Sequence, residues 1–195
     1  MTVDDETIER LVGAAKLGDP EAFGLLFDHF YGPVYRYVAA RVGRPSDAED
    51  LAQLVFVKAL EALPRYELRG VPFGGWLFKL ARNVVIDHIR TRREHVTLDL
   101  AVERSTEEAG PGELAALRQE LDSVAYALRR LTPEQREAIE LRLFARLSAR
   151  EAAEAMGRPE GTVRGLQFRA IAALRRELGV EPDADELGRA SGGHR

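Results

Sequence analysis

The sequence predicts an all-α protein made of two small helical domains that a flexible linker joins. Three observations lead to this fold class. Leucine, alanine and arginine are abundant, whereas aromatic residues make up only 7% of the 195 residues, and this composition favours helices over strands. No convincing stretch alternates between apolar and polar residues with a period of two. One internal segment lacks helical periodicity and separates two groups of predicted helices.

Helix-start signals and apolar spacing place the individual helices. Ser46 and Ser148 each precede a glutamate by three residues, which is the pattern of a capping box, and Thr132 precedes a proline, a favoured first helical residue. The predicted helices span residues 5–17, 20–42, 47–62, 73–93, 113–130, 133–145, 148–156 and 160–178.

The segment from His95 to Gly112 is the predicted linker. It consists mostly of acidic or small residues and closes with Gly-Pro-Gly, a composition typical of connections between domains. We therefore expect one domain at residues 1–94, a linker at 95–112, a second domain at 113–178 and a disordered polar tail at 179–195.

The composition and motifs exclude several classes of protein. The four histidines are scattered without a second ligand at metal-binding spacing, and no glycine motif for phosphate is present. The absence of cysteine excludes disulfides and thiolate metal sites. The polar start is unlike a secretory signal, and no apolar run approaches the roughly 18 residues of a membrane span. We expect no enzymatic activity, no cofactor, no metal, no membrane insertion and a cytoplasmic location.

Basic residues are concentrated in one predicted helix, although the formal net charge is −4. Between Lys79 and Arg93 the chain has five basic residues and a single acid, Asp87. Because phosphate attraction is screened within roughly 8–10 Å, local charge rather than net charge decides nucleic-acid binding. Tyr66 and Phe73 in the glycine-rich stretch before this helix could stack on single-stranded bases. The alternative is a core helix with a solvated basic face, in which Phe73 and Trp76 are simply buried. Trp76 is expected in the core under either interpretation.

Residues 147–178 predict a helix-turn-helix. Gly157 can supply the left-handed residue that ends a short first helix, and Pro159 precedes the second. On that second helix Val163, Leu166 and Ala170 share an apolar face, while Phe168 lies among arginines. An ordinary helical hairpin remains the alternative, but a large apolar group on a basic face favours a DNA partner.

At this point the sequence resembles a known family. PFGGWLFKLARNVVIDHIRTRR is similar to the F-x-x-W-L-x-x-[IL]-A-R-N-x-x-x-D-x-x-R signature of bacterial sigma factors of the extracytoplasmic-function type. DAEDLAQLVFVKAL resembles the D-A-E-D-L-x-Q-x-x-F motif, and LTPEQREAIELR and TVRGLQFRAIAALR resemble the second sigma domain. The resemblance extends from about Asp19 to Leu178. Leu54, Pro159 and Gly165 depart from the family pattern.

The resemblance implies three binding surfaces and no catalysis. The first would bind the clamp helices of core RNA polymerase through Asp47, Glu49, Asp50, Leu51 and Gln53. The second domain would also contact core polymerase, at the flap. The second would read and melt the minus-ten promoter element through Phe73, Lys79, Arg82, Asn83, Asp87, Arg90 and Arg93. The third would read the double-stranded minus-thirty-five element through Thr162, Arg164, Gln167, Phe168 and Arg169. Members of the family also commonly meet an anti-sigma factor.

The resemblance therefore predicts a dissociable subunit of RNA polymerase that directs promoter-specific initiation. Two other classes stay open at this stage. One is a stand-alone helix-turn-helix regulator, and the other is an interaction protein that sequesters polymerase or another factor.

Overall fold

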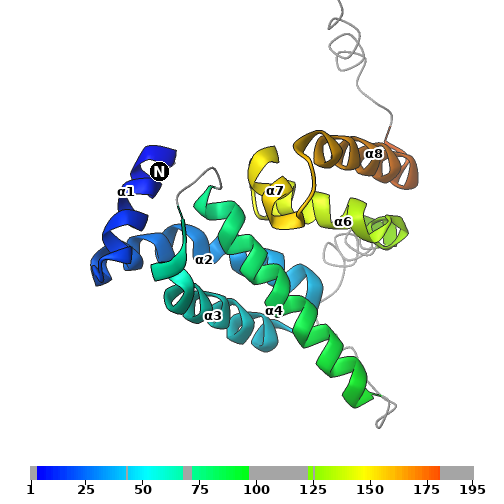
Figure 1. The fold of residues 1–195 in the computed structure, drawn as a ribbon. Coiled ribbons are helices and arrows are strands. Elements are labelled where there is room, and N and C mark those ends of the chain that lie inside the picture. Colours follow the sequence, from blue (N-terminus) through cyan, green and yellow to red (C-terminus); the bar gives the residue numbers. More distant parts are fainter. Residues whose placement is uncertain (1–3, 43, 68–71, 97–122, 125, 181–195) are drawn as a thin grey trace, which may run out of the picture. The chain divides into compact units, whose positions relative to one another are not determined.

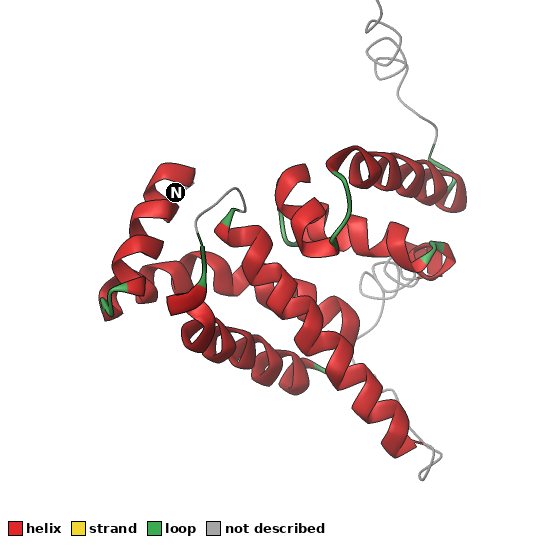
Figure 2. Ribbon diagram, viewed as in Figure 1, coloured by secondary structure: helices red, strands yellow, loops and turns green. Residues whose placement is uncertain are grey.

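The computed structural model of the protein describes residues 4–42, 44–67, 72–96, 123–124 and 126–180 (Figure 1). All secondary structure in this part of the chain is helical, and the described residues contain no strand (Figure 2). The prediction of an all-α fold is confirmed.

The helices lie close to the predicted positions. They are α1 (Asp5–Lys16), α2 (Pro20–Val42), α3 (Pro45–Ala62), the 3₁₀ turn η1 (Leu63–Arg65), α4 (Phe73–Val96), α6 (Pro133–Ile139), the π-helical segment η2 (Glu140–Phe144), α7 (Ala149–Met156) and α8 (Glu160–Leu178). Residues 123–124 and 126–130 are also helical. The predicted linker overlaps the last two residues of α4, while residues 97–112, the start of the second predicted domain and the tail from residue 181 lie outside the described residues.

Two helix starts agree with the sequence signals and one does not. Ser148 and Glu151 form the expected reciprocal capping box, and Thr132 and Gln135 exchange the equivalent bonds before α6. The capping box predicted at Ser46 is wrong. Helix α3 begins two residues before the predicted start, at Pro45, and its N-cap Arg44 makes no side-chain capping bond. Proline suits the first helical position because its missing N–H has no intrahelical partner there.

The chain divides into two compact units, and each is described here by itself. The first comprises residues 1–103 and 140–164. In its core α2, α3 and α4 contribute fully buried side chains such as Tyr37, Val55, Phe78 and Val85. The Tyr37 and Phe78 rings meet edge to face with centroids 5.6 Å apart, a geometry that aromatic pairs prefer.

Helix α1 is fixed at its start by its own cap. The Asp4 carboxylate accepts a hydrogen bond from the Thr7 N–H at 2.7 Å, and this bond holds the pKa of Asp4 below its usual value. Val12 and Ala15 bury the inner face of the helix. The Lys16 ammonium donates to the carbonyl of Tyr66, which joins the end of α1 to the segment before α4.

The second unit comprises residues 104–139 and 165–195. Its described core is small and joins Leu131, Ile139 and Ala170, with Leu128, Ile171, Ala173 and Leu174 packed against it. Arg136 donates from Nε to the carbonyl of Leu128 at 3.0 Å, which ties α6 to the preceding helical residues. The apolar face of α8 thus supplies part of this core.

The turn between α7 and α8 allows a direct test of the backbone geometry. Gly157 has φ +62° and no atom within 4 Å of where a Cβ would lie. We expect Gly157→Ala to lower the free energy of unfolding by about 1 kcal/mol, because the left-handed conformation penalises any Cβ. Gly161→Ala is the matched control, since Gly161 lies in helix α8 with equally open space, and should not destabilise. Urea unfolding of both variants measures the change in the free energy of unfolding. Equal changes in the two variants would contradict the left-handed conformation assigned to Gly157.

Candidate nucleic-acid interface

Helix α4 buries one face and exposes the other. Leu77, Ala81, Val84 and Val85 are buried, so the apolar stripe predicted from the sequence is the face that packs into the core. Trp76 was expected in the core but is only half-buried. The indole packs against the buried rings of Tyr66 and Phe73 and keeps part of its surface in solvent.

An aromatic cluster holds the start of α4. Phe73 lies 5.4 Å from Phe30 and 5.4 Å from Trp76 by ring centroids, and Tyr66 lies 4.8 Å from Trp76. Tyr66 and Phe73 are each only 4% exposed. Burial, with the nearby charges of Glu9 and Glu154, raises the pKa of Tyr66 to about 12. Both rings predicted to stack on bases therefore face inward, and Phe73 instead packs the first turn of α4.

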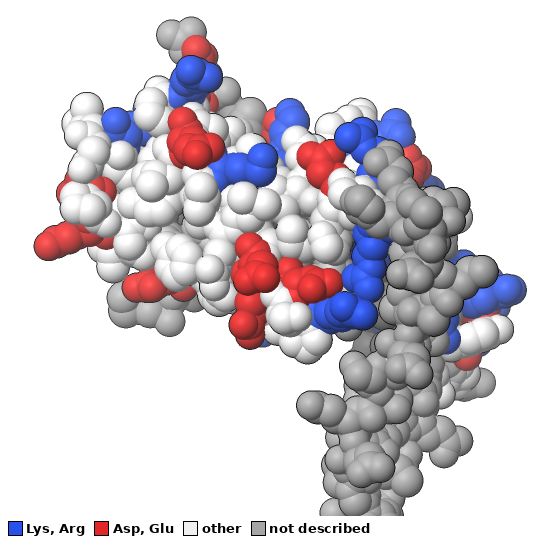
Figure 3. Space-filling model, turned by 90° about the horizontal axis from the view of Figure 1, so that it is seen from below, with Lys and Arg blue, Asp and Glu red and all other residues white. Residues whose placement is uncertain are grey.

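The solvent side of α4 carries the polar residues predicted to meet promoter DNA. Lys79, Asn83, Asp87 and Arg90 are exposed, with Ile86 between them at 40% exposure. Arg82 is half-buried and has an interaction partner. Arg93 lies within α4, but its side chain is outside the described residues. Figure 3 shows basic and acidic side chains interspersed on the face that it draws.

Helix α3 divides its predicted polymerase-binding residues between two directions. Glu49, Asp50 and Gln53 are exposed, and Leu51 is half-buried. Asp47 instead approaches α4, with its Oδ2 3.2 Å from Arg92 Nη1 and 3.9 Å from His88 Nε2. The side chain of Asp47 thus links the start of α3 to the later turns of α4.

The exposed side of α3 also carries three apolar residues, of which only Leu54 was noted from the sequence, as a departure from the family pattern. Leu54 is 40% exposed, Val57 52% and Leu60 53%. These three residues follow directly after Gln53 and are spaced three apart, which places them along one side of the helix. That spacing could have identified this apolar surface from the sequence. Three neighbouring apolar side chains on a surface helix are typical of a protein-binding site.

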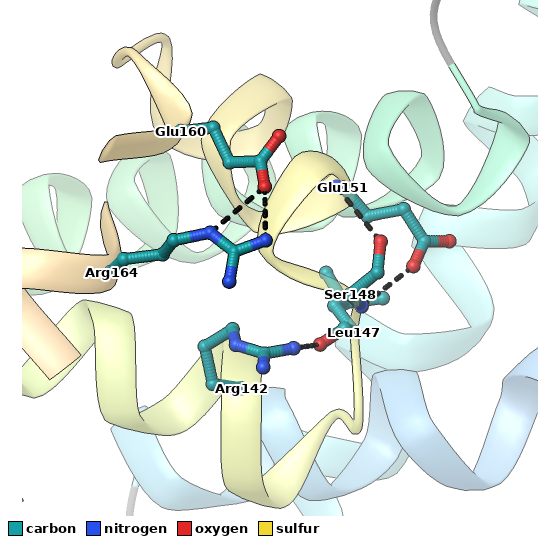
Figure 4. A network of polar contacts seen from close by, with 6 residues as sticks. All are labelled: Arg142, Leu147, Ser148, Glu151, Glu160 and Arg164. Atoms are coloured by element: carbon teal, nitrogen blue, oxygen red, sulfur yellow. Dashed lines mark hydrogen bonds and ion pairs between the residues drawn. The ribbon is translucent and has the colours of Figure 1, made fainter. Parts of the chain in front are cut away.

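The first helix and turn of the predicted helix-turn-helix have the expected geometry (Figure 4). Ser148 Oγ accepts from the Glu151 N–H at 3.2 Å, and a Glu151 oxygen accepts from the Ser148 N–H at 2.8 Å. Gly157 then ends α7 in the left-handed conformation, as predicted. Before α7, Arg142 donates to the carbonyl of Leu147 and supports the turn at which Arg146 has a positive φ.

Helix α8 presents its predicted DNA-reading residues to solvent. Thr162, Arg164 and Arg169 are exposed, while Gln167 is half-buried and has a polar contact. Phe168 is 72% exposed, so a large apolar ring stands on the outer surface. Val163, Leu166 and Ala170 are buried, as the sequence pattern indicates. Arg164 is held by Glu160 one turn earlier, with Nη2 2.6 Å from Oε1 (Figure 4).

The described residues show neither a metal-binding cluster nor a membrane-spanning helix. No group of three or more histidine, aspartate or glutamate side chains among them is placed to hold a metal ion. No helix in the same part of the chain combines the length and apolar character that a membrane crossing requires.

Comparison with protein families assigns most of the chain to two known domains. The family model described as sigma-70 region 2 matches residues 26–95, and that described as sigma-70, region 4 matches residues 127–176. The first match covers α3, α4 and most of α2, and the second covers α6, η2 and α7 and all but the end of α8.

Individual relatives support the same family assignment. The chain is 37% identical over 184 residues to the ECF RNA polymerase sigma factor BldN of Streptomyces coelicolor, which covers 90% of this chain and 67% of BldN. It is 38% identical to the ECF RNA polymerase sigma factor ShbA of Streptomyces griseus, with 88% of this chain and 96% of ShbA covered.

Two solved structures resemble the fold. CnrH, solved in complex with the cytosolic domain of CnrY, has a TM-score of 0.66 at 27% identity and covers 92% of this chain and all of that one. The sigma factor RpoE from Bartonella quintana, solved with the anti-sigma factor NepR, has a TM-score of 0.64 at 26% identity and covers 82% of this chain and 98% of that one.

The buried phenol of Tyr66 generates a prediction for alkaline pH. Its pKa in the folded protein is about 12 against an ordinary value of 10.0, so the unfolded chain releases this proton first. The stability that depends on the neutral phenol is therefore complete below pH 10 and is lost as pH rises towards 12.

Urea unfolding of the wild-type protein and Tyr66→Phe at about pH 8 and about pH 11 measures this effect. The wild type should lose more stability than the variant over that interval. Lys16 bonds to the carbonyl of residue 66, which phenylalanine retains. Equal losses in the two proteins would show that Tyr66 ionises freely.

Proposed function

The chain belongs to the extracytoplasmic-function sigma factors of the sigma-70 family, and we propose which of its exposed residues contact polymerase and which contact promoter DNA. As a sigma factor it binds core RNA polymerase and directs promoter-specific initiation of transcription.

The first domain, residues 1–94, contacts polymerase and the minus-ten element. Glu49, Asp50 and Gln53 on α3 supply polar contacts to core polymerase, and the apolar residues Leu54, Val57 and Leu60 extend that surface. A binding patch of this composition buries its apolar centre against the partner and leaves the charged residues at the rim. Asp47, which also bonds to Arg92 on α4, and the half-buried Leu51 complete this surface.

The solvent side of α4 meets the minus-ten element. Lys79 and Arg90 contribute positive charge toward phosphates, and Asn83 can both donate and accept hydrogen bonds at a base edge. Arg82, Asp87 and Arg93 complete this surface. Phe73 contributes indirectly, because its buried ring fixes the first turn of α4 on which the other residues depend.

The second domain, residues 113–178, reads the minus-thirty-five element with α8. The main support for this assignment is the exposed face of α8, where Phe168 is 72% exposed and lies on the same helix as the exposed Arg164 and Arg169. Arginine can bond a guanine edge with two donors, and an aromatic ring can contact a thymine methyl group. Thr162 at the start of the helix is suited to a phosphate, and Gln167 to a base or phosphate.

An anti-sigma factor is a candidate regulator of this chain. Relatives with this fold have been solved with protein partners, one of them a named anti-sigma factor, which supports control of this chain by a protein of the same kind. A protein that works as a subunit of RNA polymerase acts in the cytoplasm and needs no cofactor of its own.

The two kinds of surface should separate by mutation. We expect Arg164→Ala to reduce transcription from a cognate promoter about tenfold or more while core polymerase binding is unchanged, because loss of one bidentate base contact costs about 1–3 kcal/mol. Transcription assays with purified core polymerase and co-purification with core measure the two effects. Loss of core binding in Arg164→Ala would contradict the assignment.

The reverse pattern is expected on α3. Substituting Asp50 and Gln53 together by alanine should weaken core binding, while the isolated protein keeps its fold and helix content because both side chains are exposed. Glu21→Ala is a matched control, since Glu21 is an exposed acid in the first turn of α2. Transcription that is unaffected by the double substitution, or by omitting the protein altogether, would overturn the proposal.

A further inference from the structure

Helix α1 takes no part in the binding surfaces proposed above. It lies before residue 26, where the match to sigma-70 region 2 begins. Its first turn is held by the Asp4 cap, and Val12 and Ala15 are buried on its inner face. The helix packs on α2 and also meets η1 and α4. Helix α1 therefore borders the segment through which the chain enters α4.

The last residue of α1 bonds to that segment. The Lys16 ammonium donates to the carbonyl of Tyr66, 50 positions later in the chain. Tyr66 ends η1 with extended backbone, so this bond fixes the direction in which the chain leaves the turn. A lysine in the last turn of a helix also suits the partial negative charge there. That role needs no burial, whereas Lys16 is half-buried, and a half-buried charge requires a hydrogen-bond partner such as this carbonyl.

The ring of Tyr66 extends this contact to the first turn of α4. It lies 4.8 Å from the ring of Trp76 and 5.8 Å from that of Phe73, by centroids. Burial raises the pKa of the Tyr66 phenol to about 12, and the charge of Glu9 on α1 adds to this effect. Tyr66 thus bonds to α1 through its carbonyl and packs on α4 through its ring.

The first turn of α4 leads directly into the surface proposed for the minus-ten element. Lys79, the first exposed residue of that surface, follows Trp76 by three positions, less than one helical turn. Binding is weaker when loops and side chains must be ordered as the partner binds. Unstacking and unpairing of bases cost free energy that contacts with the separated strand must offset. A first turn that is already fixed therefore favours opening of the promoter.

We infer that Lys16 is a positioning residue for promoter opening, whose bond to Tyr66 holds the first turn of α4 in the orientation that the separated DNA strand requires. Lys16 acts through Tyr66 and itself touches neither DNA nor polymerase. The inference rests on the proposed function for its consequence at a promoter. The effect of Lys16 on the start of α4 is a property of the protein alone.

Three variants isolate the ammonium of Lys16. Lys16→Met keeps a long unbranched side chain and a similar helix propensity but has no donor. Lys16→Arg keeps the positive charge and the donors. Arg10→Met is the matched control, because Arg10 is an exposed basic residue of α1 whose guanidinium bonds within the helix to Thr7. Circular dichroism should show the same helix content in all three variants.

The chain's only tryptophan reports on the start of α4. Trp76 is half-buried beside Tyr66, so loss of that packing exposes more of the indole to solvent. We expect Lys16→Met to shift the Trp76 emission to the red and to raise its acrylamide quenching constant. Lys16→Arg and Arg10→Met should keep the wild-type values. Unchanged emission and quenching in Lys16→Met would overturn the inference.

Transcription from two templates tests the consequence. One is a duplex promoter identified by sequencing the transcripts that core polymerase makes with this protein, and the other is the same promoter with its minus-ten element already mismatched open. We expect Lys16→Met to lower transcription from the duplex about tenfold, the effect of losing one hydrogen bond to a charged group. Transcription from the opened template and binding to core polymerase should be unchanged. Lys16→Arg should restore most of the activity on the duplex.

The two templates separate opening from binding. An equal loss on both would overturn the inference, because it would place the defect in binding of DNA or polymerase. Wild-type protein that directs no transcription from either template would overturn the proposed function, and the promoter role of Lys16 with it. The Trp76 measurement would then still decide separately whether Lys16 holds the start of α4.

Discussion

The arrangement of the first compact unit depends on helix α4, which must be buried along one side and exposed along the other. The buried side supplies Leu77, Ala81, Val84 and Val85 to a core shared with α2 and α3. Removing four such side chains from water contributes several kcal/mol, whereas the basic residues on the other side contribute little to stability. Packing therefore fixes the rotation of α4 about its axis, and that rotation determines that Lys79, Asn83 and Arg90 face solvent.

The same division explains how an acidic protein can carry surfaces for DNA. Acidic residues lie in the first turns of α1 and α3, where helix dipoles favour them. Basic residues gather on α4 and α8, where they meet solvent. Because attraction to phosphate is short-ranged at ordinary salt, the local charge on each helix determines its partner, and the formal charge of −4 does not oppose binding at either face.

Helical periodicity and capping residues predicted most of the fold, because these signals are local. The left-handed Gly157 and the capping box at Ser148 are decided within four residues of sequence. Local patterns could not decide whether Tyr66 and Phe73 are buried, since their burial depends on Phe30 of α2 and, for Tyr66, on Trp76 of α4. The contact of Asp47 with Arg92 was not predictable for the same reason, because it joins residues 45 positions apart. The contact of Arg41 with Glu140 spans 99 positions, and no local pattern marks it.

The account centres on a sigma factor whose exposed helix faces give core RNA polymerase its choice of promoter. The most direct measurement is sequencing of the transcripts that core polymerase makes from genomic DNA with and without this protein. With the protein present, transcripts should start at a new and specific set of promoters. The same transcripts with and without the protein would contradict the account.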